Sequence, residues 1–173
     1  MSVVTIKKGN HYPCFAKYSF APLIYLKDEI YFQSIINIPF YSFFAFPGED
    51  VLDYNKLYGV SFGHHHKNES YRYGFRMGKK GWIDISLYYY IKGKRFIEFL
   101  TVLQSDKKYC YNIFIDKKNK KILFSITDFF GYRIINTVSK DINNFKLFGY
   151  TLGPYIGGNL TAPKDVDIIM ELI

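Results

Sequence analysis

The sequence has few cysteines and no long hydrophobic run, and each absence excludes a class of protein. The two cysteines, Cys14 and Cys110, are too few for the disulfide framework of a small secreted domain, so we expect free, buried thiols. No apolar stretch approaches the ~20 residues of a membrane-spanning helix, which predicts a chain without a membrane span. The first residues also lack an apolar signal core and a small-residue cleavage site, so we expect no export by the general secretory route.

A complete catalytic motif is also missing. The acidic residues are scattered through the sequence, whereas glycoside hydrolysis needs a close pair of carboxylates. We find no glycine-rich phosphate loop and no nucleophile elbow around a serine. The run His64-His65-His66 suggests a metal site, but an extended strand would turn His65 away from its neighbours, and a third ligand would have to come from a distant strand. We therefore expect no metal and no other cofactor.

Basic residues outnumber acidic ones, which gives the chain a net charge of +8. Such a charge fits nucleic acid, an acidic glycan or another anionic surface. The basic residues are scattered, however, and the lysines at positions 117, 118, 120 and 121 have the pattern of a solvated hairpin tip. The sequence therefore does not favour nucleic acid as a partner.

Aromatic residues are abundant, and almost every segment alternates with a period of two. Tyrosine and phenylalanine, with 17 residues each, account for nearly all of the 20% aromatic content, and large rings pack well on the half-buried surface of a sheet. The expected strands span residues 3–8, 14–20, 29–36, 57–64, 71–77, 81–91, 95–103, 109–116, 120–127, 132–138, 145–152 and 166–173.

Short linkers containing Gly, Asn or Asp separate these segments and indicate antiparallel hairpins. Helical periodicity is poor, and a turn or two of helix is expected only at residues 50–56, where Asp50 would cap its start. There is no internal repeat, linker or low-complexity tract. The pattern predicts an all-β fold in which residues 1–173 form a single antiparallel β-sandwich domain of the jelly-roll type.

The expected strands at 57–64, 71–77 and 81–91 share a surface that we expect to bind a partner. In each strand one set of alternate residues is apolar and suits the core, whereas the opposite set is polar or aromatic. The predicted ligand-binding residues on this opposite face are Ser61, His65, Arg72, Arg76, Trp82, Tyr88 and Tyr90. Arginine matches carboxylates and tyrosine rings stack on sugars, so the face suits an acidic sugar; cross-strand ion pairs or a subunit interface remain alternatives.

Two short segments carry a resemblance to known proteins. The segment with Tyr155, Gly157, Gly158, Ala162, Pro163 and Asp165 resembles the end of concanavalin-like jelly rolls, including some polysaccharide lyases. The hairpin with His66, Lys67, Asn68, Ser70, Arg72 and Gly74 resembles uncharacterised small β-sandwich proteins of Bacteroidetes-type bacteria and their phages. The resemblance implies a concanavalin-like fold and a glycan or virion setting. Because a signal peptide is not expected, we predict a location in a virion or in the bacterial cytoplasm. The resemblance carries over no catalytic residues, because the turn residues of the first segment are also explained by the turn itself.

Three hypotheses follow from these patterns. The first is a non-catalytic binding or structural module, either a phage virion or fibre component or a glycan-binding protein, with glycan or neighbouring virion subunits as partners and a homo-oligomeric state. The second is a polysaccharide lyase that cleaves a uronate-containing glycan by β-elimination, with His65 and Tyr88 or Tyr90 as base and acid and Arg72 or Arg76 holding the carboxylate. The third is a pure assembly protein that buries the same face against a neighbour.

Overall fold

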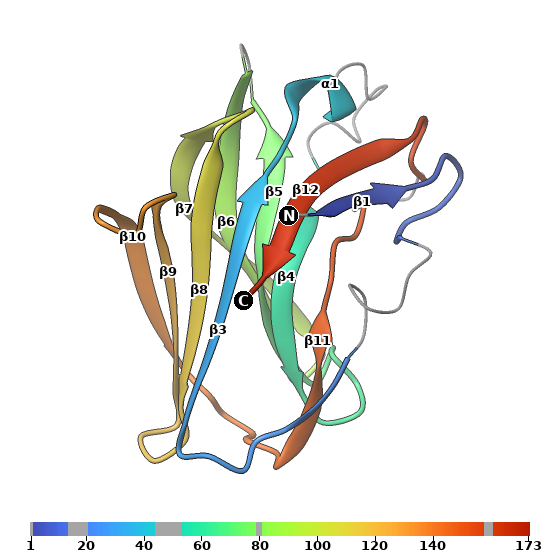
Figure 1. Cartoon of the computed structure of the whole chain (residues 1–173). Coiled ribbons are helices and arrows are strands. Elements are labelled where there is room, and N and C mark those ends of the chain that lie inside the picture. The colour runs from blue at the N-terminus through green and yellow to red at the C-terminus, as the bar shows by residue number, and fades with distance from the viewer. Residues whose placement is uncertain (1, 14–20, 44–52, 79–80, 158–160) are drawn as a thin grey trace.

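The structure is a computed structural model, and it describes residues 2–13, 21–43, 53–78, 81–157 and 161–173. These residues form two antiparallel sheets of six strands each, which lie face to face (Figure 1), and one short helix, α1. The elements are β1 (Ser2–Ile6), β2 (Pro22–Ile24), β3 (Glu29–Asn37), α1 (Phe40–Phe43), β4 (Asn55–Phe62), β5 (Glu69–Met77), β6 (Trp82–Ile91), β7 (Lys94–Gln104), β8 (Lys108–Asp116), β9 (Lys121–Asp128), β10 (Ile134–Asp141), β11 (Phe148–Leu152) and β12 (Val166–Leu172).

The strand order identifies a jelly-roll sandwich. The first sheet has the order β1-β12-β3-β8-β9-β10, and the second has the order β2-β11-β4-β5-β6-β7. Within each sheet, hairpins of consecutive strands (β8-β9-β10 and β4-β5-β6-β7) lie beside strands from distant parts of the chain. The predicted all-β, concanavalin-like fold is thus confirmed.

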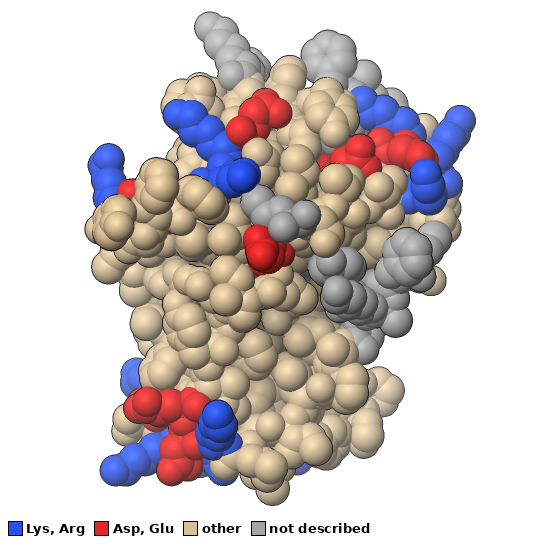
Figure 2. Space-filling view, in the orientation of Figure 1, with Lys and Arg blue, Asp and Glu red and all other residues tan. Residues whose placement is uncertain are grey.

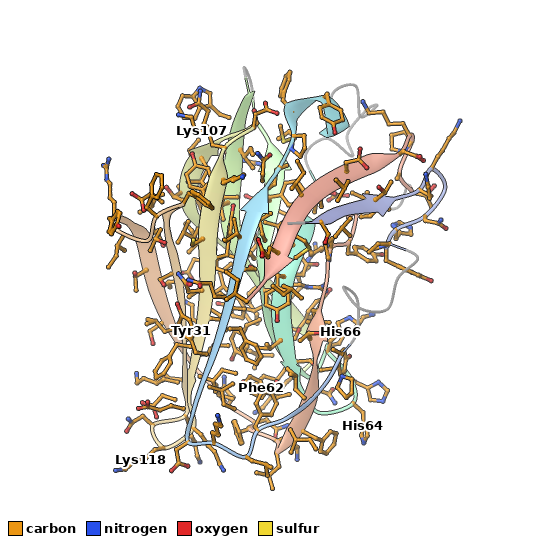
Figure 3. The ribbon with its side chains drawn as sticks, viewed as in Figure 1. Tyr31, Phe62, His64, His66, Lys107 and Lys118 are labelled. Atoms are coloured by element: carbon orange, nitrogen blue, oxygen red, sulfur yellow. The ribbon has the colours of Figure 1, made fainter. Side chains whose placement is uncertain are left out.

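The alternation seen in the sequence places the core as predicted. Tyr58, Val60 and Phe62 of β4 are buried, and so are Tyr71, Tyr73 and Phe75 of β5; Figure 3 shows Phe62 between the two sheets. The Tyr73 hydroxyl donates to the backbone oxygens of Asn112 and Ser125 in the opposite sheet, at 2.9 and 3.0 Å. A buried tyrosine therefore joins the sheets by hydrogen bonds as well as by packing.

Several element bounds differ from the sequence prediction. The helix expected at 50–56 is wrong where the structure describes it, because Asn55 and Lys56 begin β4. Strand β4 ends at Phe62, since Gly63 has a φ of +88° that turns the chain, so the three histidines lie in a turn. The helix α1 and the short strand β2 were not predicted. The expected strand at 14–20, together with Cys14, lies outside the described residues, whereas Cys110 is a buried free thiol.

Charged side chains are unevenly distributed over the face of the sandwich that Figure 2 shows. On the outer face of the first sheet, Figure 2 shows acidic and basic residues towards the ends of the strands and a largely uncharged middle. The lysine-rich segment forms the turn between β8 and β9, as predicted, and Lys118 lies at its tip (Figure 3). Among the helices of the described residues, none is long and apolar enough to cross a bilayer.

Candidate functional site

A cavity of about 800 Å³ opens on the outer face of the second sheet. Residues of β4 to β7 and of β11 line it, together with residues from the segment after β1, the segment before β4, the turn between β4 and β5, and the segment after β11. Its lining combines cations and tyrosines with single residues of other kinds. The lining residues are Lys56, Lys67, Arg72 and Arg95; Tyr12, Tyr54, Tyr88, Tyr90 and Tyr155; and Asp53, His66, Ile97 and Leu152.

Strand register brings the central residues of this cavity together. Arg72 of β5 pairs with Tyr88 of β6, and Tyr90 of β6 pairs with Arg95 of β7. On the other side Arg72 pairs with Gly59 of β4, where an added Cβ would lie 2.1 Å from the Arg72 Cβ. A glycine is therefore required at position 59, because any side chain there would collide with Arg72 and the β5 backbone.

Arg72 is a buried cation, and no carboxylate among the described residues forms an ion pair with it. Its side chain is only 7% exposed, its Nε atom is buried without a hydrogen-bond partner, and its guanidinium lies over the Tyr88 ring, 5.6 Å from the ring centre. Burial lowers the pKa of Arg72 from its ordinary value, but a guanidinium stays protonated at neutral pH. The site thus holds a fixed positive charge whose hydrogen-bonding capacity is not fully used.

Lys56 is the second buried cation of the cavity. A β-bulge between Lys56 and Gly59 shifts the register of β4, and the Lys56 Nζ lies 4.6 Å from the centre of the Tyr88 ring and 5.1 Å from that of Tyr155. Burial, and next the positive charge of Arg72, lower the pKa of Lys56 to about 8, although Asp53 acts in the opposite direction. Most molecules therefore carry the ammonium form at pH 7, and a sizeable minority carry the neutral amine.

Hydroxyl and imidazole groups line the remaining wall. The Tyr88 and Tyr90 hydroxyls are 3.2 Å apart, and the His66 ring meets the Tyr90 ring edge to face at 5.9 Å. Burial, followed by the hydrogen bond to Tyr90, raises the pKa of Tyr88 to about 12. Burial and then the charge of Arg72 lower the pKa of His66. At neutral pH the cavity therefore presents the neutral phenol of Tyr88 and the neutral imidazole of His66 beside its cations.

The charge balance of this lining favours an anion. Lys56, Lys67, Arg72 and Arg95 outweigh Asp53, which is the one carboxylate among the described lining residues. Buried charges are costly unless they are paired, so a carboxylate ligand would relieve the desolvation of Arg72 and Lys56. The tyrosine rings add apolar surface with polar tips, which suits a sugar ring.

Three of the predicted ligand-binding residues meet in this cavity, namely Arg72, Tyr88 and Tyr90. Ser61 is buried instead, where its hydroxyl donates to the Tyr150 backbone oxygen at 3.2 Å. His65 is exposed in the turn after β4 and does not line the cavity. The prediction for His65 assumed a strand that continues to residue 64, whereas the chain already turns at Gly63.

The other two predicted residues lie on the same sheet face but further along the strands. The Arg76 Nε donates to the Asp84 carboxylate at 2.9 Å, and the guanidinium also covers the Tyr54 ring at 5.1 Å. Trp82 is 48% exposed and lies six residues from Tyr88 on β6, a separation of roughly 20 Å in an extended strand. Arg76 thus has a structural partner, and Trp82 is distant from the cavity.

Sequence reasoning missed several lining residues for identifiable reasons. Lys56 was placed in an expected helix, and Tyr155 was read as part of a turn. The backbone of Tyr155 pairs with that of Lys56 through hydrogen bonds of 2.8 and 2.9 Å, and this pairing brings the Tyr155 ring to the cavity. Arg95 could have been found by aligning the hairpin of β6 and β7 across its Lys92-Gly93 turn.

Neither the histidine turn nor the C-terminal motif forms a metal-binding group among the described residues. Over the described residues, no group of three or more His, Cys, Asp or Glu side chains is arranged to hold a metal ion. Figure 3 shows His64 and His66 at the same end of the sandwich, but the His64 ring contacts Phe148 at 4.4 Å, whereas His66 lines the cavity. In the motif, Asp165 accepts a hydrogen bond from the Lys8 amide at 2.9 Å, which is the structural role expected for it.

Comparisons with known proteins give the fold and no family. No protein-family model matches the sequence, and no curated protein matches it. The solved structures that resemble it include a xylan β-1,4-xylosidase from Bacillus halodurans C-125, with a TM-score of 0.55 and 6% identity over 92% of this chain and 34% of that chain. This chain therefore spans about a third of the xylosidase chain.

Two smaller proteins match over most of their own length. The CBM2 module of the evolved Dit of Lactobacillus casei BL23 phage J-1 has a TM-score of 0.52 and 8% identity, over 98% of this chain and 74% of that chain. The winged bean acidic lectin, solved with methyl-α-D-galactose, has a TM-score of 0.50 and 10% identity, over 99% of this chain and 86% of that chain. These likenesses agree with the topology, and the protein has a concanavalin-like jelly-roll fold.

Proposed function

We propose that the protein is a non-catalytic glycan-binding module, and that its cavity on the second sheet binds a sugar carrying a carboxylate. The observation that supports this most strongly is Arg72, a buried guanidinium that belongs to the lining of an open cavity and whose Nε has no hydrogen-bond partner among the described residues. A carboxylate matches the fork of a guanidinium and forms charge-assisted hydrogen bonds with it.

The other lining residues fit the rest of such a ligand. Lys56 supplies a second positive charge above the Tyr88 ring, and Tyr155 and Tyr90 supply aromatic faces and hydroxyls. The single carboxylate Asp53 leaves the described lining without the acid pair that glycoside hydrolysis needs. The geometry therefore favours binding of an acidic sugar in the cavity, without hydrolysis.

Calorimetric titration with oligoglucuronate, and with a neutral glucan oligosaccharide of equal length, tests the proposal. We expect the acidic oligosaccharide to bind at least tenfold more tightly, because a charge-assisted hydrogen bond contributes about 1.5–3 kcal/mol. The variant Arg72→Met should lose that preference, since it removes the charge and keeps most of the volume. Equal binding of both sugars, or unchanged binding by Arg72→Met, would contradict the proposal.

Arg133→Met is the control for the loss of one arginine charge. Arg133 is exposed before β10 and does not line the cavity. We expect its binding to equal that of the original protein. Thermal unfolding of each variant shows whether a loss of binding comes from a loss of folding.

A second candidate function is β-elimination on the same acidic glycan, and the position of His66 favours it. The base takes the C5 proton, a phenol protonates the departing O4 as the C4–O bond breaks, and a C4–C5 double bond forms. His66 carries a lowered pKa and touches the Tyr90 ring, whereas His65 is outside the cavity. In this reading His66 replaces His65 as the base, Tyr88 or Tyr90 is the acid, and Arg72 neutralises the carboxylate.

Ultraviolet absorbance of the unsaturated product distinguishes the two functions. A lyase would produce this absorbance from a panel of uronate polymers, and the His66→Ala variant would lose it while still binding the polymer. A panel without any product, together with tight binding, would leave the binding module as the function.

We further infer a phage particle or bacterial glycan system as the setting, with a homo-oligomer as the working form. The likeness to the phage J-1 Dit module and to the lectin supports this setting at the level of fold. Light scattering of the purified protein tests the oligomeric state. Protection of the cavity face from labelling in the oligomer would instead favour the assembly hypothesis.

A further inference from the structure

Lys56 differs from a surface lysine in its surroundings. Its side chain is only 8% exposed, and the ammonium lies between the rings of Tyr88 and Tyr155. In the part of the chain that the structure describes, no carboxylate forms an ion pair with it. The amine therefore faces an open cavity without the partner that would hold it in the charged form.

The charges around Lys56 also disfavour its ammonium form. Arg72 and Arg95 repel the positive charge and Asp53 attracts it, while burial has the largest effect. With its pKa lowered from 10.5 to about 8, about half of the molecules hold a neutral amine at pH 8. An ordinary lysine would be neutral in only about 0.3% of molecules at that pH. Burial beside another cation is a known way to activate an amine as a nucleophile.

We propose that Lys56 is a nucleophilic amine that forms an imine with the carbonyl carbon of a small 2-oxo acid, whose carboxylate is bound by Arg72. The amine lone pair attacks the carbonyl carbon and gives a carbinolamine. Loss of its hydroxyl as water then forms the C=N bond, so each imine releases one water molecule and no electrons are exchanged. The proposal goes beyond glycan binding and does not require it.

The geometry provides both parts of this site. Lys56 and Arg72 both contact the ring of Tyr88, both line the cavity, and the charge of Arg72 acts on Lys56, so an amine and a guanidinium belong to the same site. A Cβ at Gly157 would come within 2.9 Å of the Lys56 Nζ, so the glycine leaves free the space around the amine. Dehydration of the carbinolamine needs a proton donor, and the ring that carries the neutral Tyr88 hydroxyl lies under the amine.

Reductive trapping tests the proposal on the full chain. The protein is incubated with pyruvate and cyanoborohydride at pH 8, and the modified lysines are located and quantified by peptide mass spectrometry. We expect Lys56 to be modified at least tenfold faster than Lys67, an exposed lysine on the same cavity that serves as an internal control. Equal rates at the two lysines would overturn the proposal.

The role of Arg72 is separated by changing the carbonyl compound. Arg72→Met should slow trapping of pyruvate at Lys56 at least tenfold relative to trapping of acetaldehyde, which has no carboxylate. An unchanged ratio of the two rates would overturn the carboxylate assignment. Lys56→Arg should abolish the labelled peptide and keep the fold, as judged by circular dichroism.

The same experiment distinguishes this proposal from glycan binding. Trapping requires the neutral amine, so its rate should rise between pH 7 and pH 8, whereas binding of an acidic glycan requires the ammonium. Tight glycan binding without selective trapping would overturn only the imine proposal. Selective trapping without glycan binding would overturn only the glycan proposal.

Discussion

At the residue scale, the buried cations of the cavity lower the free energy of unfolding. Lys56 and Arg72 are removed from water without a carboxylate partner among the described residues, and such charges destabilise a fold. Sites that bind charged ligands commonly carry such a cost, because the ligand provides the missing interaction.

Replacing Lys56 should therefore stabilise the protein. We expect Lys56→Met to raise the free energy of unfolding by about 3 kcal/mol at pH 7, as the pKa shift implies. The folded pKa of about 8 lies below the unfolded value of 10.5, so the unfolded state binds more protons between these values. Stability of the original protein should rise from pH 8 towards pH 9.5, and the variant should lack this rise. Urea unfolding at pH 7 and pH 9.5 measures the stability of the variant and its dependence on pH. A variant less stable than the original protein at pH 7 would contradict the destabilising role of Lys56.

The same lysine predicts a pH dependence of binding. Affinity for oligoglucuronate should fall as the pH increases through about 8, because the ammonium of Lys56 is lost. Lys56→Arg should bind with little change over that range, since a guanidinium stays charged. Calorimetry between pH 6.5 and pH 9 tests this, and parallel pH profiles of the two proteins would exclude Lys56 as the cause.

At the scale of elements, close approach of β4 to β5 shapes the site. Gly59→Ala would put a Cβ 2.1 Å from the Arg72 Cβ and 2.3 Å from the Tyr71 backbone oxygen. We expect it to destabilise the fold by more than about 2 kcal/mol and to abolish glycan binding, because the two strands must separate. At Gly74 the nearest atom to an added Cβ is the Ser86 hydroxyl, at 2.8 Å, which can rotate. Gly74→Ala should cost less, and thermal unfolding that ranks the two variants in the opposite order would contradict this.

A buried carboxylate fixes the start of β5. Glu69 accepts hydrogen bonds from the Tyr71 hydroxyl at 2.8 Å and from the backbone amides of Asn143 and Asn144. Glu69→Gln places an NH2 group against one of these two backbone amides in either orientation of the side chain, so we expect a loss of about 2 kcal/mol in unfolding free energy. Urea unfolding measures it, with Glu98→Gln as a control at a more exposed ion pair to Lys140. An effect of Glu69→Gln no larger than that of the control would argue against this role.

At the scale of the whole molecule, the net charge of +8 attracts polyanions of any kind, whereas the cavity should select sugars that carry a carboxylate. We expect the double variant Lys118→Gln and Lys120→Gln, at the exposed β8–β9 tip, to weaken retention on a heparin column. It should leave oligoglucuronate binding unchanged at about 0.5 M salt, where exposed charges are largely screened. Equal loss of both would mean that surface charge, and not the cavity, binds the glycan.

The sequence was sufficient for the fold class and for part of the site. Period-two alternation placed Tyr71, Tyr73 and Phe75 in the core and Arg72 and Tyr88 on the opposite face, because these are local consequences of strand geometry. Lys56 and Tyr155 were missed because they meet through a backbone bridge between residues about a hundred positions apart. Such long-range pairing has no local pattern.

The positions of β11 and β12 in the sheets determine when the first strands can pair during folding. In the first sheet β12 lies between β1 and β3, and in the second sheet β11 lies between β2 and β4. On a ribosome, β1 and β2 emerge first but have no neighbours to pair with until the C-terminal strands follow. The hairpins of β4 to β10 can assemble earlier, so both sheets are completed by insertion of late strands beside waiting early ones. Completion of the sandwich therefore depends on long loop closures, and it should be slow.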